Sequence, residues 1–204
     1  MAKVDLARRA EIGRERRAKT RAQLVEAGEM LLAERPPEAL TVDAVVDAAG
    51  VAKGTFYYHF QSIDELAAAV GAKLGESFDE LLTPARLEFR DPVERLSFAF
   101  TQFLERAISD AGWARLVVQS SQSATEFGLG VRANLKADIS EAIAQDRLTV
   151  RDAELAADIV IGIWLQVTRG ILERGGQREL TRQASEAVLR ALGALPQEPN
   201  LAIG

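Results

Sequence analysis

A short run of side chains between residues 53 and 59 can bind phosphates and the edges of nucleic-acid bases. The run reads Lys-Gly-Thr-Phe-Tyr-Tyr-His. A lysine ammonium can reach guanine acceptors or phosphate, and tyrosine hydroxyls can donate hydrogen bonds to phosphate oxygens. Lys53 and Thr55 would occupy the first turn of a helix, the part of a DNA-reading helix that comes nearest to the bases. The run therefore predicts contact with double-stranded DNA.

Two short helices joined by a glycine turn would position these side chains. Thr41 suits the start of the first helix, because its hydroxyl can accept a hydrogen bond from an unpaired backbone N–H. Gly50 suits its end, where a left-handed residue closes a helix at little steric cost. Between them, one apolar face is formed at helical spacing by Val42, Val45, Val46 and Ala49. With a second helix beginning near Lys53, the segment has the pattern of a helix-turn-helix.

Ordered matches to a known signature extend through this segment and beyond it. They are Thr41-Val42, Ala49-Gly50-Val51, the run from Lys53 to Phe60, and Ser62-Ile63-Asp64-Glu65-Leu66. This series resembles the DNA-binding signature of the tetracycline-repressor (TetR) family of bacterial transcriptional regulators, and the resemblance covers residues 14 to 70. The DNA contacts that it implies are Thr41, Lys53, Gly54, Thr55, Tyr57, Tyr58 and His59. Phe56 and Phe60 are expected to be core residues instead.

One position departs from this signature. Ile63 follows Ser62 at a place where the family commonly has a lysine that binds phosphate. We expect an arginine of the N-terminal segment to supply this contact, from among Arg14, Arg16, Arg17 and Arg21. Of these, Arg17 is included in the predicted DNA-binding set.

The distribution of charge favours nucleic-acid binding, although the net charge of −5 does not. Residues 1–21 contain eight Lys or Arg and three Asp or Glu, a net charge of +5, so the remaining residues carry −10. A basic arm ahead of a helix-turn-helix, with an acidic body behind it, is typical of a DNA-binding protein. On charge alone, the alternative is a solvated tail.

Several other functions find no support in the sequence. It has no cysteine, which excludes a disulfide framework and thiolate zinc sites. His59 is the only histidine, and no second metal ligand lies near it. Gly128-Leu129-Gly130 lacks the preceding strand and the third glycine of a dinucleotide-binding motif. We expect neither enzymatic activity nor a cofactor or metal.

The chain is also expected to be soluble and cytoplasmic, with no membrane partner. Its longest apolar run, residues 159–167, is far shorter than the roughly 18–20 residues that span a bilayer. The charged N-terminus has no apolar segment behind it, so it does not read as a signal peptide.

The fold is predicted to be all-α, since helix signals occur throughout and alternation with period two is missing. We expect an N-terminal three-helix helix-turn-helix domain over residues 1–62 and a larger helical ligand-binding and dimerisation domain over residues 63–204, with about nine helices in total. Outside the helix-turn-helix, the expected helices cover residues 11–34, 62–82, 91–111, 113–121, 131–146, 150–174 and 181–195. Ser62 and Glu65 fit a capping box, and Pro84 is expected just beyond the end of the helix that they begin.

The resemblance implies a small-molecule effector bound in the larger domain. Such a site needs an apolar pocket with a few polar groups. The candidates are Phe100, Phe103, Trp113, Gln119, Phe127, Trp164 and Thr168. For each aromatic residue, the alternative is a purely structural place in the core. The helix over residues 150–174 is apolar on most sides, which favours a central core position or, by the resemblance, a homodimer interface shared with the helix over residues 181–195.

The prediction is therefore a cytoplasmic, homodimeric DNA-binding transcriptional regulator. It would act as a repressor that a small apolar or amphipathic ligand releases from a palindromic operator. Two alternatives stay open. One is a DNA-binding protein with no regulatory ligand, and the other is an all-helical binding domain in which the helix-turn-helix is only a scaffold.

Overall fold

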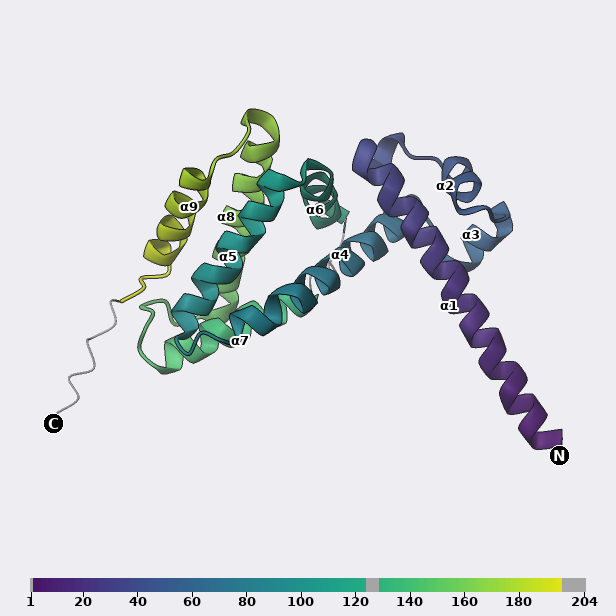
Figure 1. Cartoon of the computed structure of the whole chain (residues 1–204), viewed down its shortest axis with the longest axis horizontal. Coiled ribbons are helices and arrows are strands. Elements are labelled where there is room, and N and C mark those ends of the chain that lie inside the picture. The colour runs from purple at the N-terminus through teal and green to yellow at the C-terminus, as the bar shows by residue number, and fades with distance from the viewer. Residues whose placement is uncertain (1, 124–128, 196–204) are drawn as a thin grey trace. The chain divides into compact units, whose positions relative to one another are not determined.

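Helices account for almost all of the structure that the chain adopts (Figure 1). The computed structural model describes residues 2–123 and 129–195, and within them it contains nine α-helices and one short 3₁₀ helix. The helices are α1 Ala2–Glu34, η1 Pro37–Ala39, α2 Val42–Ala49, α3 Lys53–His59, α4 Ile63–Arg86, α5 Pro92–Ser109, α6 Ala111–Ser123, α7 Leu129–Ala144, α8 Ala153–Arg174 and α9 Arg178–Ala191. The prediction of an all-α fold is confirmed.

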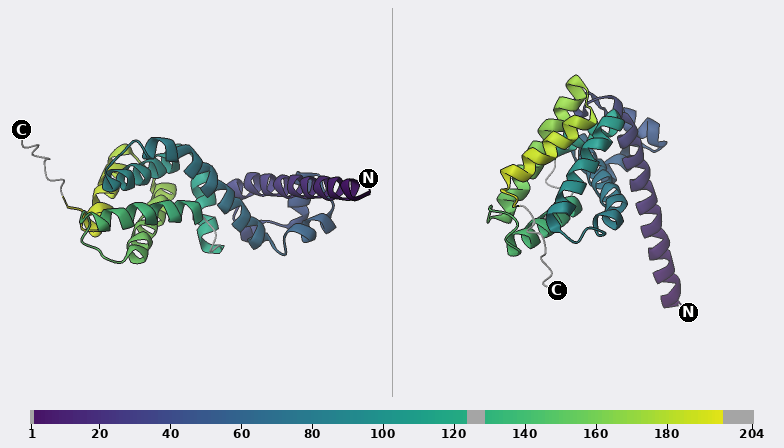
Figure 2. Two further views of the ribbon diagram at one scale, coloured as in Figure 1. Left: turned by 90° about the horizontal axis from the view of Figure 1, so that it is seen from below. Right: turned by 60° about the vertical axis from the view of Figure 1, so that its left-hand side comes forward.

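The basic N-terminal segment belongs to α1, which begins at Ala2 rather than at the expected Glu11 (Figure 2). Its composition gives the reason, because alanine, glutamate, lysine and arginine dominate the first 21 residues and are strong helix formers. Pro36 and Pro37 follow the end of α1, as expected from their missing N–H groups. The basic side chains of this segment are therefore arranged along a helix.

The described residues fall into two compact units. The first contains residues 2–73 and 119–123, and the second contains residues 74–118 and 129–195. The division lies inside α4, so this helix contributes to both units. α6 likewise crosses the division near its C-terminal end. α4 thus connects the two units through its backbone.

The first unit buries the apolar faces of α1, α2, α3 and the start of α4. Its least exposed large side chains are Leu24, Leu32, Val45, Phe56, Phe60, Leu66 and Val70. Burying one such side chain contributes roughly 1.5–3 kcal/mol to stability. α1 and α4 approach closely at Gly28, where an added Cβ would lie 3.0 Å from Leu66 Cδ2. A side chain at this position would force the buried Leu66 to move.

Local capping residues fix the starts of several helices, at Thr41 as the sequence predicts and at Asp152 for α8, which begins at Ala153 rather than at the expected residue 150. Thr41, Asp91 and Asp152 each accept a hydrogen bond from a backbone N–H in the first turn of α2, α5 and α8, at 3.2, 2.9 and 2.9 Å. At α4, Ser62 Oγ accepts from Glu65 N at 3.2 Å. The Glu65 carboxylate, however, accepts from the N–H of the residue before Ser62, at 2.6 Å. Only one of the two bonds of the expected capping box is therefore formed.

α4 continues through Pro84 to Arg86, although the sequence predicts that it ends before the proline. Proline removes one helical hydrogen bond, but Pro84 is exposed, so the carbonyl left without a donor can face water. The added turn carries Arg86, whose ion pair with Asp138 joins this end of α4 to α7. A partner distant in the sequence thus stabilises the last turn.

α5 lies at the centre of the second unit. It contacts α7, α8 and α9, and α8 also contacts α7 and α9 (Figure 1). The buried side chains of α5 include Leu96, Phe100, Phe103 and Leu104. Buried charges of this core are paired: Arg95 donates to Asp138 at 2.8 Å, and the partly buried Arg147 donates to the buried Asp91 at 2.7 Å. Because each buried charge has a partner, their burial is tolerated.

α8 is the one described helix that is long and apolar enough to cross a membrane by length and composition. This differs from the sequence expectation, which considered only the shorter run of residues 159–167. Core helices of soluble proteins pass the same test, and α8 packs against α5, α7 and α9. Only 39% of its most apolar window is buried within the chain. Within the described residues, Leu155 of α8 is exposed and several of its other apolar side chains, among them Ile159 and Ile163, are only partly covered.

Candidate nucleic-acid interface and ligand cavity

The helix-turn-helix consists of α2, a turn at Gly50, and α3. Gly50 is left-handed, with φ 66° and ψ 35°, and its N–H closes the end of α2. Other residues are strained at such a φ, which explains the glycine. Phe56 and Phe60 are buried, with ring centres 5.9 Å apart, and they hold α3 against the core. The opposite face of α3 is left to solvent.

The exposed face of α3 carries the side chains that the sequence predicts to contact DNA. Tyr57 and Tyr58 expose 55% and 68% of their surfaces. Lys53 is exposed in the first turn, and Thr55 and His59 are partly exposed. Hydroxyl, amine and imidazole groups on one exposed face suit phosphate oxygens and base edges. The structure thus brings these five predicted residues together on one short helix.

Two further predicted contacts, Thr41 and Gly54, lie at the starts of the two helices. Thr41 is exposed, and its hydroxyl accepts the capping hydrogen bond from Ala44 N. An added Cβ at Gly54 would have no atom within 4 Å, so the first turn of α3 is bare on that side. Backbone can therefore approach a phosphate closely at this point.

Lys53 is paired with Asp43 of α2, with 2.8 Å between Nζ and Oδ1. Both side chains are more than half exposed, so the pair contributes little to stability. The hydrogen bond and the charge of Asp43 raise the pKa of Lys53, and the ammonium is protonated at neutral pH. Lysine has three N–H donors. Asp43 occupies one of them and leaves the others for a phosphate or a base.

Arginines of α1 lie beside the end of α3. Burial lowers the pKa of His59, and the charges of Arg21 and Arg17 lower it further, so the imidazole is neutral at pH 7. The Arg21 guanidinium also lies over the Phe60 ring, 4.9 Å from its centre. Both arginines are exposed. They add positive charge near α3. Ile63 adds none, because it stands where the family signature commonly has a lysine.

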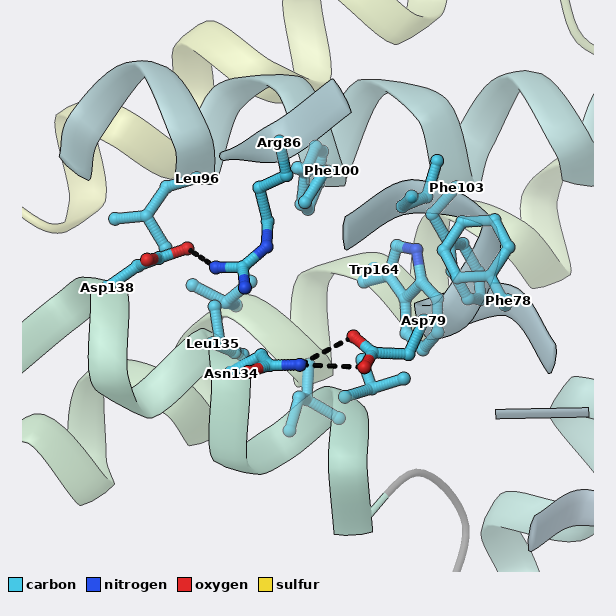
Figure 3. Close-up of a pocket in the computed structure, with 15 residues that line it drawn as sticks. Phe78, Asp79, Arg86, Leu96, Phe100, Phe103, Asn134, Leu135, Asp138 and Trp164 are labelled. Carbon is cyan, nitrogen blue, oxygen red and sulfur yellow. Dashed lines mark hydrogen bonds and ion pairs between the residues drawn. The ribbon is translucent and has the colours of Figure 1, made fainter. Parts of the chain in front are cut away.

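A cavity of about 70 Å³ lies inside the second unit, between α4, α5, α7 and α8 (Figure 3). Its wall is mainly apolar and includes the rings of Phe78, Phe100, Phe103 and Trp164. The polar residues of the wall are Asp79, Arg86, Asn134 and Asp138. Apolar walls with a few convergent polar groups are typical of small-molecule sites.

Three of the predicted ligand residues, Phe100, Phe103 and Trp164, line this cavity. Trp113 is not in the wall but packs behind it. Its ring centre is 4.6 Å from that of Phe103 and 5.4 Å from that of Phe78. Phe103, Trp113 and Trp164 thus belong to one aromatic cluster with Phe78, and all of them except Trp113 line the cavity.

Gln119 and Thr168, also predicted as ligand contacts, are not among the described residues that line the cavity. The buried Thr168 hydroxyl donates to the backbone carbonyl of Trp164 at 2.8 Å, so it is already used within α8. Phe127 lies outside the described residues. The roles of these three residues stay predictions.

Sequence reasoning misses the polar groups of the cavity. Asp79 is not among the predicted ligand residues, yet both of its carboxylate oxygens accept from Asn134 Nδ2, at 2.8 and 2.7 Å (Figure 3). Arg86 pairs with Asp138 through Nη1, and both side chains are more than nine-tenths buried. One signal was available: Asp79 and Arg86 share the inner face of α4 with Leu82, at spacings of three and four. Charged residues on an apolar helix face mark a candidate site.

A groove of about 420 Å³ opens on the surface of the same unit. Phe78 and Leu82 line both the groove and the cavity, so their side chains separate the two spaces. Joined, the spaces would fall within the range of about 300–1,000 Å³ usual for small-molecule sites. Movement of Phe78 and Leu82 would therefore join the two spaces.

Two protein-family models match the chain. The one described as "Bacterial regulatory proteins, tetR family" matches residues 24–70. The one described as "Tetracyclin repressor-like, C-terminal domain" matches residues 91–200, which is more than half of the chain. The first range contains α2 and α3, and the second contains most of the cavity wall.

Two curated proteins from Pseudomonas putida are similar to the chain over part of its length. They are "HTH-type transcriptional regulator TtgR" and "Probable HTH-type transcriptional regulator ArpR". Each is 30% identical over 104 residues, which is 50% of this chain and 50% of the relative. The chain thus spans about half the length of the curated relatives that it matches.

Solved structures share the fold over most of the chain. RolR in complex with resorcinol has a TM-score of 0.76 and 22% identity, over 88% of this chain and 90% of that chain. FadR from Bacillus subtilis in complex with stearoyl-CoA has a TM-score of 0.66 and 20% identity, over 84% of this chain and 97% of that chain. At these identities the likeness establishes the fold alone.

Proposed function

Because the chain belongs to the TetR family of bacterial regulatory proteins, we propose that it binds a palindromic operator as a homodimer and that a small amphipathic ligand releases it. The chain is a helix-turn-helix transcriptional regulator and not an enzyme. Its relatives bind small ligands, resorcinol in RolR and stearoyl-CoA in FadR. Repression, the dimer, the ligand class and a cytoplasmic location are the parts that we propose for this chain.

The exposed face of α3 is the observation that carries the proposal. Lys53 stands in the first turn, and Tyr57 and Tyr58 follow with most of their surfaces free. A recognition helix enters the major groove with its N-terminal residues nearest the bases, while neighbouring elements contact the backbone. Arg17 of α1 is available for such a backbone contact. Residues 1–62 would thus form the DNA-binding domain, and residues 63–204 the effector-binding and dimerisation domain.

The partly covered side of α8 supports a homodimer. Leu155 is 52% exposed, and Ile159 is only partly buried within the chain. Next to them Gly162 is exposed, and an added Cβ would have no atom within 4 Å. The distance between packed helices depends on the side chains at their contact, so a glycine lets a second helix come close. With the small, exposed Ala187 and Ala191 of α9, two copies of α8 and α9 would form a four-helix interface.

The size of the cavity supports release through a change of conformation. At about 70 Å³ it is smaller than the roughly 150 Å³ that holds one benzene ring. A ligand must therefore move the wall apart, and it binds an expanded conformer better than the present one. Part of the wall belongs to α4. This helix begins at Ile63, which follows the helix-turn-helix in the sequence. Its movement would change the spacing of two α3 helices, which a palindromic site requires to be about 34–36 Å.

Selection of bound sequences from random and genomic DNA tests this proposal. We expect enrichment of an inverted repeat whose half-sites are centred about one helical turn apart. A Tyr57→Ala, Tyr58→Ala double variant changes only exposed side chains, so it should lose the enrichment and keep the thermal unfolding of the parent. No enriched sequence at all would contradict operator binding. Many unrelated sequences would favour a DNA-binding protein without a regulatory ligand.

A further inference from the structure

A hydrogen-bond donor without a partner lies in the wall of the cavity. Arg86 exposes only 9% of its side chain, and its Nη1 donates to Asp138. Its buried Nε–H has no hydrogen-bond partner among the described residues. An unpaired buried donor destabilises a fold, and a ligand atom that accepts from it recovers that free energy on binding. Because Arg86 also lines the cavity, its unpaired Nε–H is a donor that an occupant could use.

Asp79 supplies an acceptor in the same wall (Figure 3). Both of its carboxylate oxygens accept from one nitrogen, Asn134 Nδ2, at 2.8 and 2.7 Å. A carboxylate has about four acceptor positions. Asp79 can therefore accept a further hydrogen bond from a donor on a ligand while Asn134 holds it in place.

The balance of charge in the wall decides between a neutral and an anionic ligand. The charge of Arg86 is matched by Asp138, which also pairs with Arg95, and Arg95 pairs in turn with Glu141. Within residues 2–123 and 129–195, the partner of Asp79 is a neutral amide, that of Asn134. A ligand carboxylate would thus meet a surplus of negative charge. A neutral hydroxyl can both accept from Arg86 and donate to Asp79.

We infer that the effector is a neutral, hydroxylated aromatic molecule with one ring, whose oxygen accepts from Arg86 Nε and whose hydroxyl donates to Asp79. The inference rests on the proposed function for the role of the ligand. The aromatic part of the wall, Phe78, Phe100, Phe103 and Trp164, provides faces and edges for stacking on the ring. A single ring requires the least enlargement of the cavity.

Four probes that differ only in their polar end separate the possibilities. Calorimetric titration of the full chain would use 4-ethylphenol, 4-ethylanisole, ethylbenzene and 4-ethylbenzoate. We expect 4-ethylphenol to bind tightest, and 4-ethylanisole, which accepts but cannot donate, to bind about tenfold more weakly. Ethylbenzene and 4-ethylbenzoate should bind more weakly still. Tighter binding of either of these two, or no binding of 4-ethylphenol, would overturn the inference.

Substitution of the donor gives the second arm of the test. Arg86→Lys keeps a positive charge for Asp138 but has no Nε–H, so 4-ethylphenol should bind about 10- to 100-fold more weakly. Arg147→Lys is the matched control, because Arg147 also has an unpaired buried Nε and pairs with Asp91 but does not line the cavity. It should bind the probe as the parent does. Equal losses in the two variants, or none in Arg86→Lys, would overturn the assignment.

A further variant keeps the test decisive if Arg86→Lys does not fold. Asp79→Leu has no side-chain acceptor, so it should remove the advantage of 4-ethylphenol over 4-ethylanisole, and a retained advantage would exclude Asp79 as the acceptor. Operator release is measured separately. Release by another molecule, with no binding of 4-ethylphenol, would overturn this inference and leave the proposed function standing. Binding of 4-ethylphenol with unchanged operator affinity would support the ligand class and contradict its proposed role.

Discussion

Among single residues, Lys53 shows how the candidate interface is prepared for a nucleic-acid partner. Its ammonium lies 2.8 Å from the Asp43 carboxylate, on the exposed side of the motif. Exposed ion pairs are worth little, so exchange of the carboxylate for a phosphate is inexpensive. The pair also keeps a flexible lysine near the first turn of α3. Asp43 is therefore a positioning residue, and Lys53 is the one that would touch DNA.

Lys53→Ala tests this contact through the salt dependence of operator binding. If each Lys53 neutralises one phosphate, the slope of log K against log salt should fall by about one for each recognition helix, and so by about two for a dimer. Binding should weaken on all sequences rather than on one. The measurement is fluorescence anisotropy of a labelled operator at several salt concentrations.

Lys73→Ala is the matched control for this variant. Lys73 also pairs with a carboxylate at 2.8 Å, that of Glu29, but it lies in α4 rather than on α3. Its removal should leave the salt slope unchanged. A parental slope in Lys53→Ala, or the same decrease in both variants, would remove Lys53 from the interface.

The exposed residues of α3 are predictable from sequence, because Phe56 and Phe60 fix which side of this short helix is buried. Tyr57 and Tyr58 then lie with most of their surface in solvent. The polar groups of the cavity are different. Arg86 and Asp138 are separated by 52 positions, and no local pattern indicates that they pair. Residues whose environment is local were predicted, whereas those paired through the tertiary fold were missed.

At the scale of helices, starts that are capped by nearby residues lie at the expected residue or within about three positions of it. The caps at Thr41, Asp91 and Asp152 are of this kind, since each bonds within three positions. The end of α4 is not, because its last turn extends past Pro84 and is joined to α7 through Arg86. The start of α1 lies earlier than expected because helix propensity alone continues it to Ala2.

Gly162→Leu tests α8 as a dimer interface. Within the chain an added Cβ at this position has no atom within 4 Å, so the protomer should fold without penalty. At a close contact between helices, the added bulk should cost about 1–3 kcal/mol, which corresponds to a dimer dissociation constant roughly 5- to 150-fold higher. Sedimentation equilibrium measures this constant directly.

Gly54→Leu serves as the control for dimerisation. Gly54 is likewise a helical glycine with no atom within 4 Å of an added Cβ, but it lies on α3. This variant should dimerise as the parent does and lose operator binding. Unchanged dimerisation in Gly162→Leu would place the interface elsewhere.

For the molecule as a whole, the distribution of charge along the chain favours DNA binding through one end, and the continuous helix α4 connects that end with the ligand cavity. The first 21 residues carry +5 and the rest of the chain −10, so repulsion from DNA favours approach through the basic end. α4 contributes to the unit that holds the helix-turn-helix and to the unit that holds the cavity. A ligand that lowers operator affinity 100-fold needs a preference of the same factor for the released conformer, about 2.7 kcal/mol. Operator DNA must weaken ligand binding equally.

Hydroxyl-radical footprinting on the selected operator tests most directly whether two α3 helices of one dimer read successive major grooves. The predicted result is two symmetric protected regions on one face of the duplex, with centres about 10–10.5 base pairs apart, and their loss in the Tyr57→Ala, Tyr58→Ala variant. A single protected region, even protection along the fragment, or unchanged protection in that variant would contradict DNA binding through α3.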